Sequence, residues 1–175
     1  SDRVIVKKLQ DVQKNINNSE YDQAYEELKE AHSLAPDYFE VARFKAYFYQ
    51  KTGKYSDARE QYRLAIVLSP DTPQLHFWYG KFLLIQEESI EEAVEQFEIA
   101  YKLDENSAEL AVALARGYLL QQRFEESQNI LDSISSTIDK ADQFPQKMFY
   151  DVNVQIKYRT ADKLAKSNPI DSLLA

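Results

Sequence analysis

The feature that most constrains the fold of this chain is a pattern that recurs about every 34 residues. Four segments align, and each starts with a large apolar residue that is followed three positions later by a small one. The four large residues are Tyr21, Tyr55, Ile90 and Phe124, with spacings of 34, 35 and 34 residues. A fixed period of this length is the signature of repeat proteins, in which each unit stacks on its neighbours. The sequence therefore predicts four similar units in a row.

Each repeat also shows the residue pattern of two packed helices. Aligned residues, most of them small, recur in both halves of the repeat: Val12, Ala46, Gly80 and Ala115, then Ala24, Ala58, Ala93 and Ser127. Small residues let two helices approach closely, while large apolar side chains three and four positions away fill the seam. Pro36 and Pro70 follow second halves, where a helix must end. We expect four helix-turn-helix repeats, at about residues 5–38, 39–72, 73–107 and 108–138.

Composition excludes several other fold and function classes. Only 3 Gly and 5 Pro are present among 175 residues, too few for the turns of a sheet-rich protein. No apolar run is long enough to span a membrane, so we expect no membrane association. The net charge of −8 opposes the phosphates of nucleic acids, so we expect no nucleic-acid partner. The absence of cysteine excludes disulfides and thiolate sites and fits a reducing, cytoplasmic location.

The sequence contains no pattern that indicates catalysis or metal binding. The only histidines, His32 and His76, fall in different repeats, and their spacing is not that of metal ligands. Neighbouring acids such as Glu91 and Glu92 point in different directions on a helix, and the few scattered glycines cannot build a phosphate-binding loop. We therefore expect a protein that is not an enzyme and that uses no metal and no cofactor.

Residues 139–175 break the period of the repeats. Phe144, Met148, Val152 and Ile156 follow one another at spacings of four, which predicts one long helix with a single apolar stripe. A repeat stack needs a terminal cap, because its last unit would otherwise expose its seam. We interpret this segment as a capping helix and tail, and the alternative is a truncated fifth repeat.

The period, together with the offsets of the small, aromatic, alanine and proline residues, resembles the tetratricopeptide repeat (TPR) family. The resemblance covers roughly residues 5–138 and is best in the second repeat. The first and fourth repeats depart from the pattern, since Asn15 replaces the usual aromatic residue and Ser127 and Ile134 replace alanines. The resemblance implies an all-α fold, a right-handed superhelical solenoid of antiparallel helix pairs.

In TPR proteins, one face of each first helix lines a concave groove. The register of the repeats places three residues of each first helix on this face: Leu9, Gln13 and Ile16; Arg43, Tyr47 and Gln50; Phe77, Lys81 and Leu84; and Val112, Arg116 and Leu119. The predicted partner-binding residues among them are Arg43, Tyr47, Gln50, Phe77, Lys81, Leu84 and Arg116. The cations in this set favour a partner with acidic groups. The alternative is that they pair with acids of adjacent helices and bind nothing.

The most aromatic stretch, QLHFWYGKFLL, divides between core and surface in this register. Tyr79, Gly80 and Leu83 face the second helix of their own pair and are predicted core residues. Trp78 is expected to pack on the neighbouring repeat. Phe77 is the residue that we expect to offer an exposed aromatic platform to a partner.

These observations favour a non-catalytic scaffold or adaptor that binds a peptide or partner protein in the groove, as a domain of a larger protein. Some TPR proteins hold chaperone tails through a two-carboxylate clamp. That clamp does not match here, because Leu9, Gln13, Phe44, Gln74 and Trp78 stand at its positions.

Two further functions stay open as alternatives. The degenerate first repeat could dock Val4, Ile5 and Val6 onto a second copy or a preceding domain, which would make the chain a structural or self-association module. A secretion-type chaperone has a similar length and repeat count, and this alternative rests on analogy.

Overall fold

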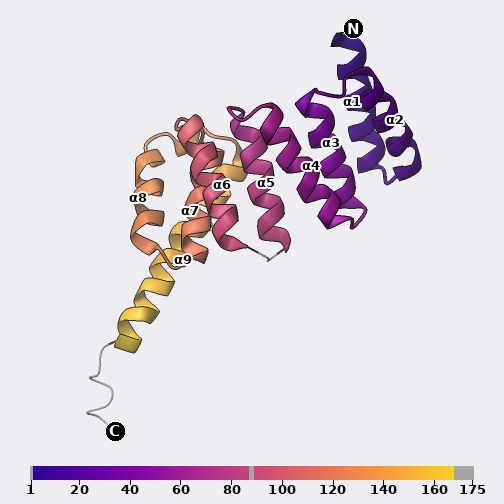
Figure 1. The fold of residues 1–175 in the computed structure, drawn as a ribbon. Coiled ribbons are helices and arrows are strands. Elements are labelled where there is room, and N and C mark those ends of the chain that lie inside the picture. The colour runs from indigo at the N-terminus through magenta and orange to yellow at the C-terminus, as the bar shows by residue number, and fades with distance from the viewer. Residues whose placement is uncertain (1, 87–88, 168–175) are drawn as a thin grey trace. The chain divides into compact units, whose positions relative to one another are not determined.

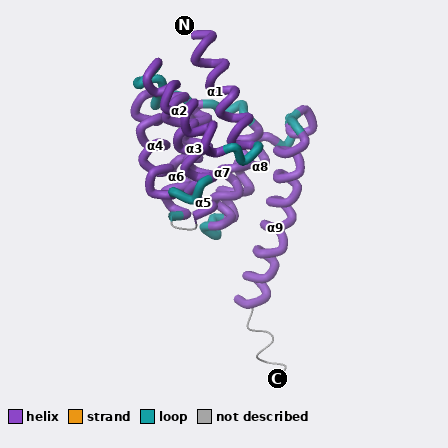
Figure 2. Tube along the Cα trace, turned by 90° about the vertical axis from the view of Figure 1, so that its right-hand side faces the viewer, coloured by secondary structure: helices purple, strands orange, loops and turns teal. Residues whose placement is uncertain are grey.

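The computed structural model describes residues 2–86 and 89–167, and these residues form helices joined by short turns (Figure 1, Figure 2). Since the described residues contain no strand, the predicted all-α class is confirmed. The chain divides into two compact units, residues 1–82 and 83–175. The predicted tail at residues 168–175 lies outside the described residues.

The helices follow the period of the sequence, and each second helix begins at one of the four aligned residues. The helices α1 to α8 are 11 to 16 residues long, whereas α9 has 25 residues. In chain order the elements are α1 (Asp2–Asn17), α2 (Tyr21–Leu34), α3 (Phe39–Lys51), α4 (Tyr55–Leu68), α5 (Pro73–Gln86), α6 (Ile90–Leu103), α7 (Ala108–Leu120), α8 (Phe124–Ile134), a short 3-10 helix η1 (Ile138–Lys140) and α9 (Gln143–Ser167).

The turns inside three of the repeats share one backbone conformation. Ser19, Gly53 and Gln122 adopt positive φ angles of 62°, 77° and 61°. In each turn the following residue donates its N–H to the carbonyl five positions earlier, as Lys54 does to Tyr49 at 2.8 Å. This is the Schellman pattern that ends many α-helices. Because only glycine adopts a positive φ without steric cost, the serine and the glutamine are held there by the helices around them.

In the first unit, α1 to α4 and the start of α5 pack around two buried clusters. The larger cluster joins α1, α2 and α3 and consists of Ile5, Leu9, Val12, Ile16, Ala24, Leu28, Ala31, Val41, Phe44 and Phe48. The smaller cluster joins α3, α4 and α5, and Trp78 packs against it. Alanines of the repeat pattern are fully buried, among them Ala46 on α3 and Ala58 on α4. Their small size lets the two helices approach closely.

In the second unit, α7, α8 and α9 pack around one buried cluster. It consists of Ala111, Val112, Ala115, Leu119, Leu131, Ile134, Ile138, Phe149, Val152 and Ile156. Gly117 allows α6 and α7 to approach, because a Cβ atom at this position would lie 2.8 Å from Cγ2 of Val94. The second unit therefore depends on a glycine that the repeat pattern did not single out.

The apolar stripe of α9 differs in one place from the prediction. Val152 and Ile156 are buried as expected, but Phe144 is 62% exposed and Phe149 is buried instead. An α-helix has 3.6 residues per turn, so positions that are always four apart drift around it, and the buried line alternates steps of three and four. Beyond Ile156, the side chains of α9 are exposed or half-buried up to Lys166. The first half of α9 therefore packs on the other helices, and its second half is largely open.

Candidate functional site

The seven predicted partner-binding residues are divided between the two compact units. Five belong to the first unit: Arg43, Tyr47 and Gln50 on α3, and Phe77 and Lys81 on α5. Two belong to the second unit: Leu84 on α5 and Arg116 on α7. All seven lie on first helices, as the repeat register requires.

Arg43 is tied into the structure rather than open to a partner. Its Nη2 donates to Oε2 of Glu40 at 2.6 Å, one turn earlier on α3. Its guanidinium carbon lies 3.9 Å from the ring centroid of Phe44 and 4.4 Å from that of Trp78 on α5. The side chain is only 15% exposed. The charge of Arg43 is therefore paired, although with an acid of its own helix rather than of an adjacent one.

Tyr47 and Gln50 are half-buried and hydrogen-bonded to neighbouring helices. The Tyr47 hydroxyl donates to Oδ1 of Asn17 on α1 at 3.2 Å. Oε1 of Gln50 accepts a hydrogen bond from the hydroxyl of Tyr62 on α4 at 2.8 Å. Burial raises the pKa of Tyr62, so its hydroxyl stays protonated and continues to donate. Both predicted residues therefore connect helices within the first unit.

Phe77 does not offer the exposed platform that the sequence predicted. It is 5% exposed, and Nζ of Lys81 lies 4.8 Å from its ring centroid. A lysine placed over a ring covers it with an aliphatic stem and keeps only the charged end in water. Lys81 itself is exposed. Within residues 2–86 and 89–167, no hydrogen bond or ion pair involves its amino group.

Arg116 is the other exposed cation of the predicted set. In the part of the chain that the structure describes, its guanidinium forms no ion pair or hydrogen bond. Its neighbours on the same face of α7, Val112 and Leu119, are buried, as is Leu9 on α1. Leu84 is half-buried. The apolar members of the predicted face are thus mostly core residues, and its open members are the two cations.

The aromatic stretch on α5 contributes mainly to the core. Tyr79, Gly80 and Leu83 are buried, as predicted. The ring of Tyr79 stacks on Tyr62 of α4, with centroids 5.8 Å apart, so it faces the preceding repeat, whereas the sequence predicted that it faces the second helix of its own pair. Trp78 packs on the cluster formed by α3, α4 and α5, which confirms that it contacts the neighbouring repeat.

Neither histidine belongs to a metal site in the described part of the chain. His76 is buried on α5, with Nε2 2.7 Å from the carbonyl oxygen of Pro70, and His32 is exposed on α2. No cluster of three or more His, Cys, Asp or Glu residues there has the arrangement to hold a metal ion. Among the same residues, no helix combines the length and the apolar character that crossing a membrane requires.

The sequence reasoning missed a polar network in the second unit. The Tyr118 hydroxyl donates to Oε1 of Glu98 at 2.8 Å, and the guanidinium carbon of Arg123 lies 4.1 Å from the Tyr118 ring centroid. Nε of Arg123 also donates to Glu126 at 2.7 Å. Burial, followed by the contact with Glu98, raises the pKa of Tyr118 to about 12. The period of the repeats aligns Tyr118 with Tyr49. Its hydrogen-bond partner Glu98 lies in the preceding repeat, at a position that the repeat pattern does not specify.

Charge is divided between the first and second helices of the repeats. The helices α1, α3 and α9 carry more Lys and Arg than Asp and Glu. The helices α2, α6 and α8 carry more Asp and Glu than Lys and Arg. In α4 and α7 the charges balance, and α5 carries Lys81 as its one charged residue. The helices α1, α3, α5 and α9 are therefore the elements of this acidic chain that carry a net positive charge.

Several solved structures are similar in fold. Yeast Tom70 matches with a TM-score of 0.76 and 21% identity over 95% of this chain, which spans 35% of the Tom70 chain. The first TPR of Spaghetti (RPAP3), bound to an HSP90 peptide, matches with a TM-score of 0.59 and 17% identity, over 70% of this chain and 96% of that chain. The Yersinia enterocolitica type III secretion chaperone SycD, in complex with a peptide of the translocator YopD, matches with a TM-score of 0.58 and 18% identity, over 69% of this chain and 96% of that chain.

At sequence identities this low, the similarity to these structures shows a shared fold. It confirms the predicted TPR-like arrangement of helix pairs. A comparison with curated proteins gave no match. The sequence model of the tetratricopeptide repeat matches residues 16–76 and 84–143, which is more than half of the chain. The protein therefore belongs to the tetratricopeptide repeat family.

Proposed function

We propose that this chain is a non-catalytic interaction module that binds an acidic peptide, or an acidic segment of a partner protein, through its first helices. The observation that carries the proposal is the state of Lys81 and Arg116. Both are exposed on first helices, and neither forms an ion pair within the described residues. Such cations give a carboxylate a charge-assisted hydrogen bond without first breaking an internal ion pair.

In the first unit, the proposed contact centres on Lys81. Its amino group stands over the Phe77 ring, and this contact holds the charge near one place on the surface of α5. A carboxylate approaches the amino group from the solvent side, while Phe77 stays buried beneath it. In this proposal Lys81 supplies the charge and Phe77 supports it.

The other predicted residues of the first unit have a positioning role in this proposal. Arg43 fixes Trp78, three residues before Lys81, and Tyr47 and Gln50 tie α3 to its neighbours. In the second unit, Arg116 offers an independent contact on α7, with Leu84 half-buried on α5.

The similar structures support a peptide as the class of ligand. The Spaghetti TPR is bound to an HSP90 peptide, and SycD is in complex with a peptide of YopD. A chaperone tail is not the expected ligand of this chain, because Leu9 and Trp78 stand at positions of the two-carboxylate clamp. We also place the interaction in the cytoplasm, since a chain without cysteine gains nothing from an oxidising compartment.

A second candidate function is self-association, with a secretion-type chaperone as a variant supported by the likeness to SycD. Val4 and Val6 favour self-association, because both are exposed on α1, whereas Ile5 is buried in the core of the first unit and does not belong to the predicted docking surface. Light scattering over a concentration series separates the candidates. A mass that rises with concentration supports self-association, and a constant monomer mass counts against it.

The proposed function is tested by capture from a cell lysate with paired charge reversals. The test variant is Lys81→Glu with Arg116→Glu. The control is Lys102→Glu with Lys140→Glu, which changes the net charge equally at exposed positions on α6 and η1. A partner held by the wild type and the control but lost by the test variant supports the proposal. A partner that all three proteins hold equally would contradict it.

A further inference from the structure

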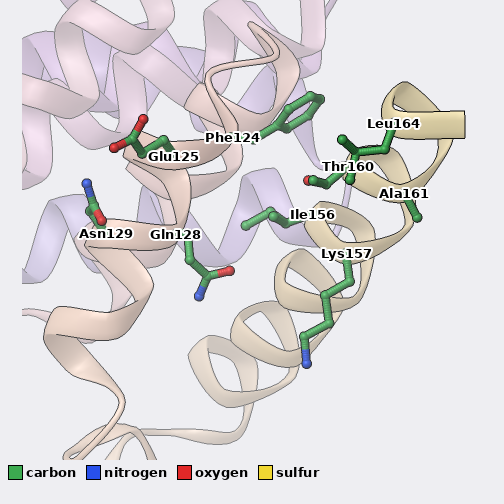
Figure 3. Close-up of a pocket in the computed structure, with 9 residues that line it drawn as sticks. All are labelled: Phe124, Glu125, Gln128, Asn129, Ile156, Lys157, Thr160, Ala161 and Leu164. Atoms are coloured by element: carbon green, nitrogen blue, oxygen red, sulfur yellow. The ribbon is translucent and has the colours of Figure 1, made fainter. Parts of the chain in front are cut away.

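The second unit contains a cleft between α8 and α9 (Figure 3). Two adjoining cavities of about 660 and 600 Å³ form it, and they share Phe124, Glu125, Thr160 and Leu164. Figure 3 shows Phe124 of α8 and Ile156, Thr160 and Leu164 of α9 pointing into the space between the two helices. None of the seven predicted partner-binding residues lines this cleft.

The helix α9 differs from the first helices of the repeats in what it packs against. The helices α1, α3 and α7 each pack along the second helix that follows them, α2, α4 and α8. Within the described residues, α9 packs on α7, α8 and η1, all of which precede it. Its C-terminal half from Lys157 to Lys166 is exposed, except for half-buried Thr160. In a repeat stack each helix packs beside another helix, so a helix is the element that fits beside the C-terminal half of α9.

The floor of the cleft is apolar. Ile156 is buried and Phe124 is half-buried, while Leu164 is 63% exposed although it faces the space between the helices. Apolar side chains at spacings of three and four on a partner helix fit a floor of this kind. Covering the leucine removes apolar surface from water, which favours binding.

The two edges of the cleft carry opposite charges. On the α9 side, Lys157 and Lys163 line the cavities, and on the α8 side Glu125 lines both of them. Within residues 89–167, none of these three charged groups forms an ion pair. Arg123 and Glu126 also border the cleft, but they pair with each other at 2.7 Å and add no net charge.

We propose that this cleft binds an amphipathic helix of a partner protein, with the apolar stripe of that helix on Phe124, Ile156 and Leu164 and its carboxylates along the α9 edge. The charges along the two edges of the cleft indicate which charged side chains the bound helix carries on each flank. The two lysines on α9 attract carboxylates, and Glu125 attracts a cation on the opposite flank of the bound helix. The α9 helix of a second copy is basic and is disfavoured, because it would bring lysines next to lysines.

The experiment uses two fluorescein-labelled synthetic helices as probes. Both carry leucine at spacings of three and four. The first has glutamate on one flank and lysine on the other, and the second has lysine on both flanks. Fluorescence anisotropy with the full chain measures the two dissociation constants at low salt. The first peptide is expected to bind about tenfold more tightly, because it alone pairs with Lys157 and Lys163.

Variants of the chain test whether the lysines on the α9 edge set the preference between the peptides and whether the apolar floor contributes to binding. Lys157→Glu with Lys163→Glu is expected to invert the preference between the peptides. The matched control, Lys140→Glu with Lys147→Glu, changes exposed lysines outside the cleft and is expected to keep the preference. Leu164→Asp is expected to weaken the binding of both peptides about tenfold, because it places a carboxylate on the apolar floor. Circular dichroism checks that each variant stays helical.

Several outcomes would overturn the proposal. Equal affinity for the two peptides, or binding of neither, would do so directly. A wild type that dimerises while Leu164→Asp is monomeric would make a second copy the occupant. Peptide binding that requires removal of residues 168–175 would make the chain's own end the occupant. The preference for the first peptide over the second is expected to persist in Lys81→Glu with Arg116→Glu, even where the loss of those two cations weakens the first peptide overall, and this separates the test from that of the proposed function.

Discussion

The guanidinium carbon of Arg43 lies 4.4 Å from the ring centroid of Trp78, and this contact joins α3 to α5. The same guanidinium donates to Glu40, so the side chain is held from two directions. Trp78 is the only tryptophan of the chain, and its fluorescence therefore reports on this single contact. A residue that the sequence suggests for partner binding serves here to connect two repeats.

Arg43→Ala is expected to lower the free energy of unfolding by about 1–2 kcal/mol, because it removes a cation–π contact and a half-buried ion pair. The emission of Trp78 is expected to shift to longer wavelength as water reaches the ring. Urea unfolding followed by tryptophan fluorescence measures both effects. Lys102→Ala, at an exposed position of α6, is the matched control. An Arg43→Ala protein with the wild-type spectrum and midpoint would show that the contact is not maintained in solution.

Gly117→Ala is expected to destabilise the protein by about 1–3 kcal/mol, although alanine favours helices. The added Cβ would lie 2.8 Å from Cγ2 of Val94, which is a stiff, branched side chain. Val94→Ala should therefore restore part of the stability when it is combined with Gly117→Ala. Thermal unfolding of the two single variants and the double variant measures this coupling. Purely additive losses would rule out the close approach of α6 and α7 at this glycine.

Gln122→Gly is expected to raise the free energy of unfolding by about 0.5–1 kcal/mol, because glycine adopts the observed φ of 61° without steric cost. The reverse change at the equivalent turn, Gly53→Ala, is expected to cost about 1 kcal/mol at a φ of 77°. Chemical denaturation of both variants measures whether each substitution raises or lowers the free energy of unfolding. The same sign for both substitutions would mean that the two turns do not share a conformation.

Tyr118→Phe is expected to destabilise the protein by about 1 kcal/mol at neutral pH, because the hydroxyl no longer donates to Glu98. This difference is expected to shrink in alkali. The pKa of Tyr118 is raised to about 12 in the folded protein, whereas tyrosine ionises near pH 10 in an unfolded chain. The folded state therefore holds the proton more tightly, and the contribution is lost as the pH rises from about 10 to about 12.

Urea unfolding at pH 8 and pH 11 measures the difference between the wild type and Tyr118→Phe. Tyr158→Phe, at an exposed position on α9, is the matched control and is expected to match the wild type at both values. If the gap between the wild type and Tyr118→Phe instead grew from pH 8 to pH 11, the hydrogen bond to Glu98 would not be the source of the stability.

The helix pairs were predictable from the sequence because their packing repeats. Ala24 and Ala58 recur at the period since each crossing of two helices needs a small residue at the same place. The same reasoning placed Trp78 on the neighbouring repeat. The repeat pattern could not reveal Gly117 or Gln122. The close approach of two helices at Gly117 and the strained turn at Gln122 each depend on the neighbouring residues of one repeat, so they do not recur at the period.

The exposure of the candidate site was not predictable in the same way. A register gives the side of the helix on which Phe77 stands, but not how deeply neighbouring side chains cover it. The pairing of Arg43 with Glu40 depends on side-chain conformations that no period encodes. Phe144 was misplaced because a strict spacing of four departs from 3.6 residues per turn, so the buried side of α9 passes to Phe149.

We propose that the exposed cations of the first helices bind an acidic partner. The most direct test is the dissociation constant of the captured partner segment for Lys81→Glu, Arg116→Glu and Lys102→Glu, each measured at low and at high salt by calorimetry. We predict that the first two substitutions weaken binding about tenfold at low salt and less at high salt, while Lys102→Glu leaves it unchanged. Equal affinity of the wild type and Lys81→Glu at both salt concentrations would contradict the proposed role of Lys81.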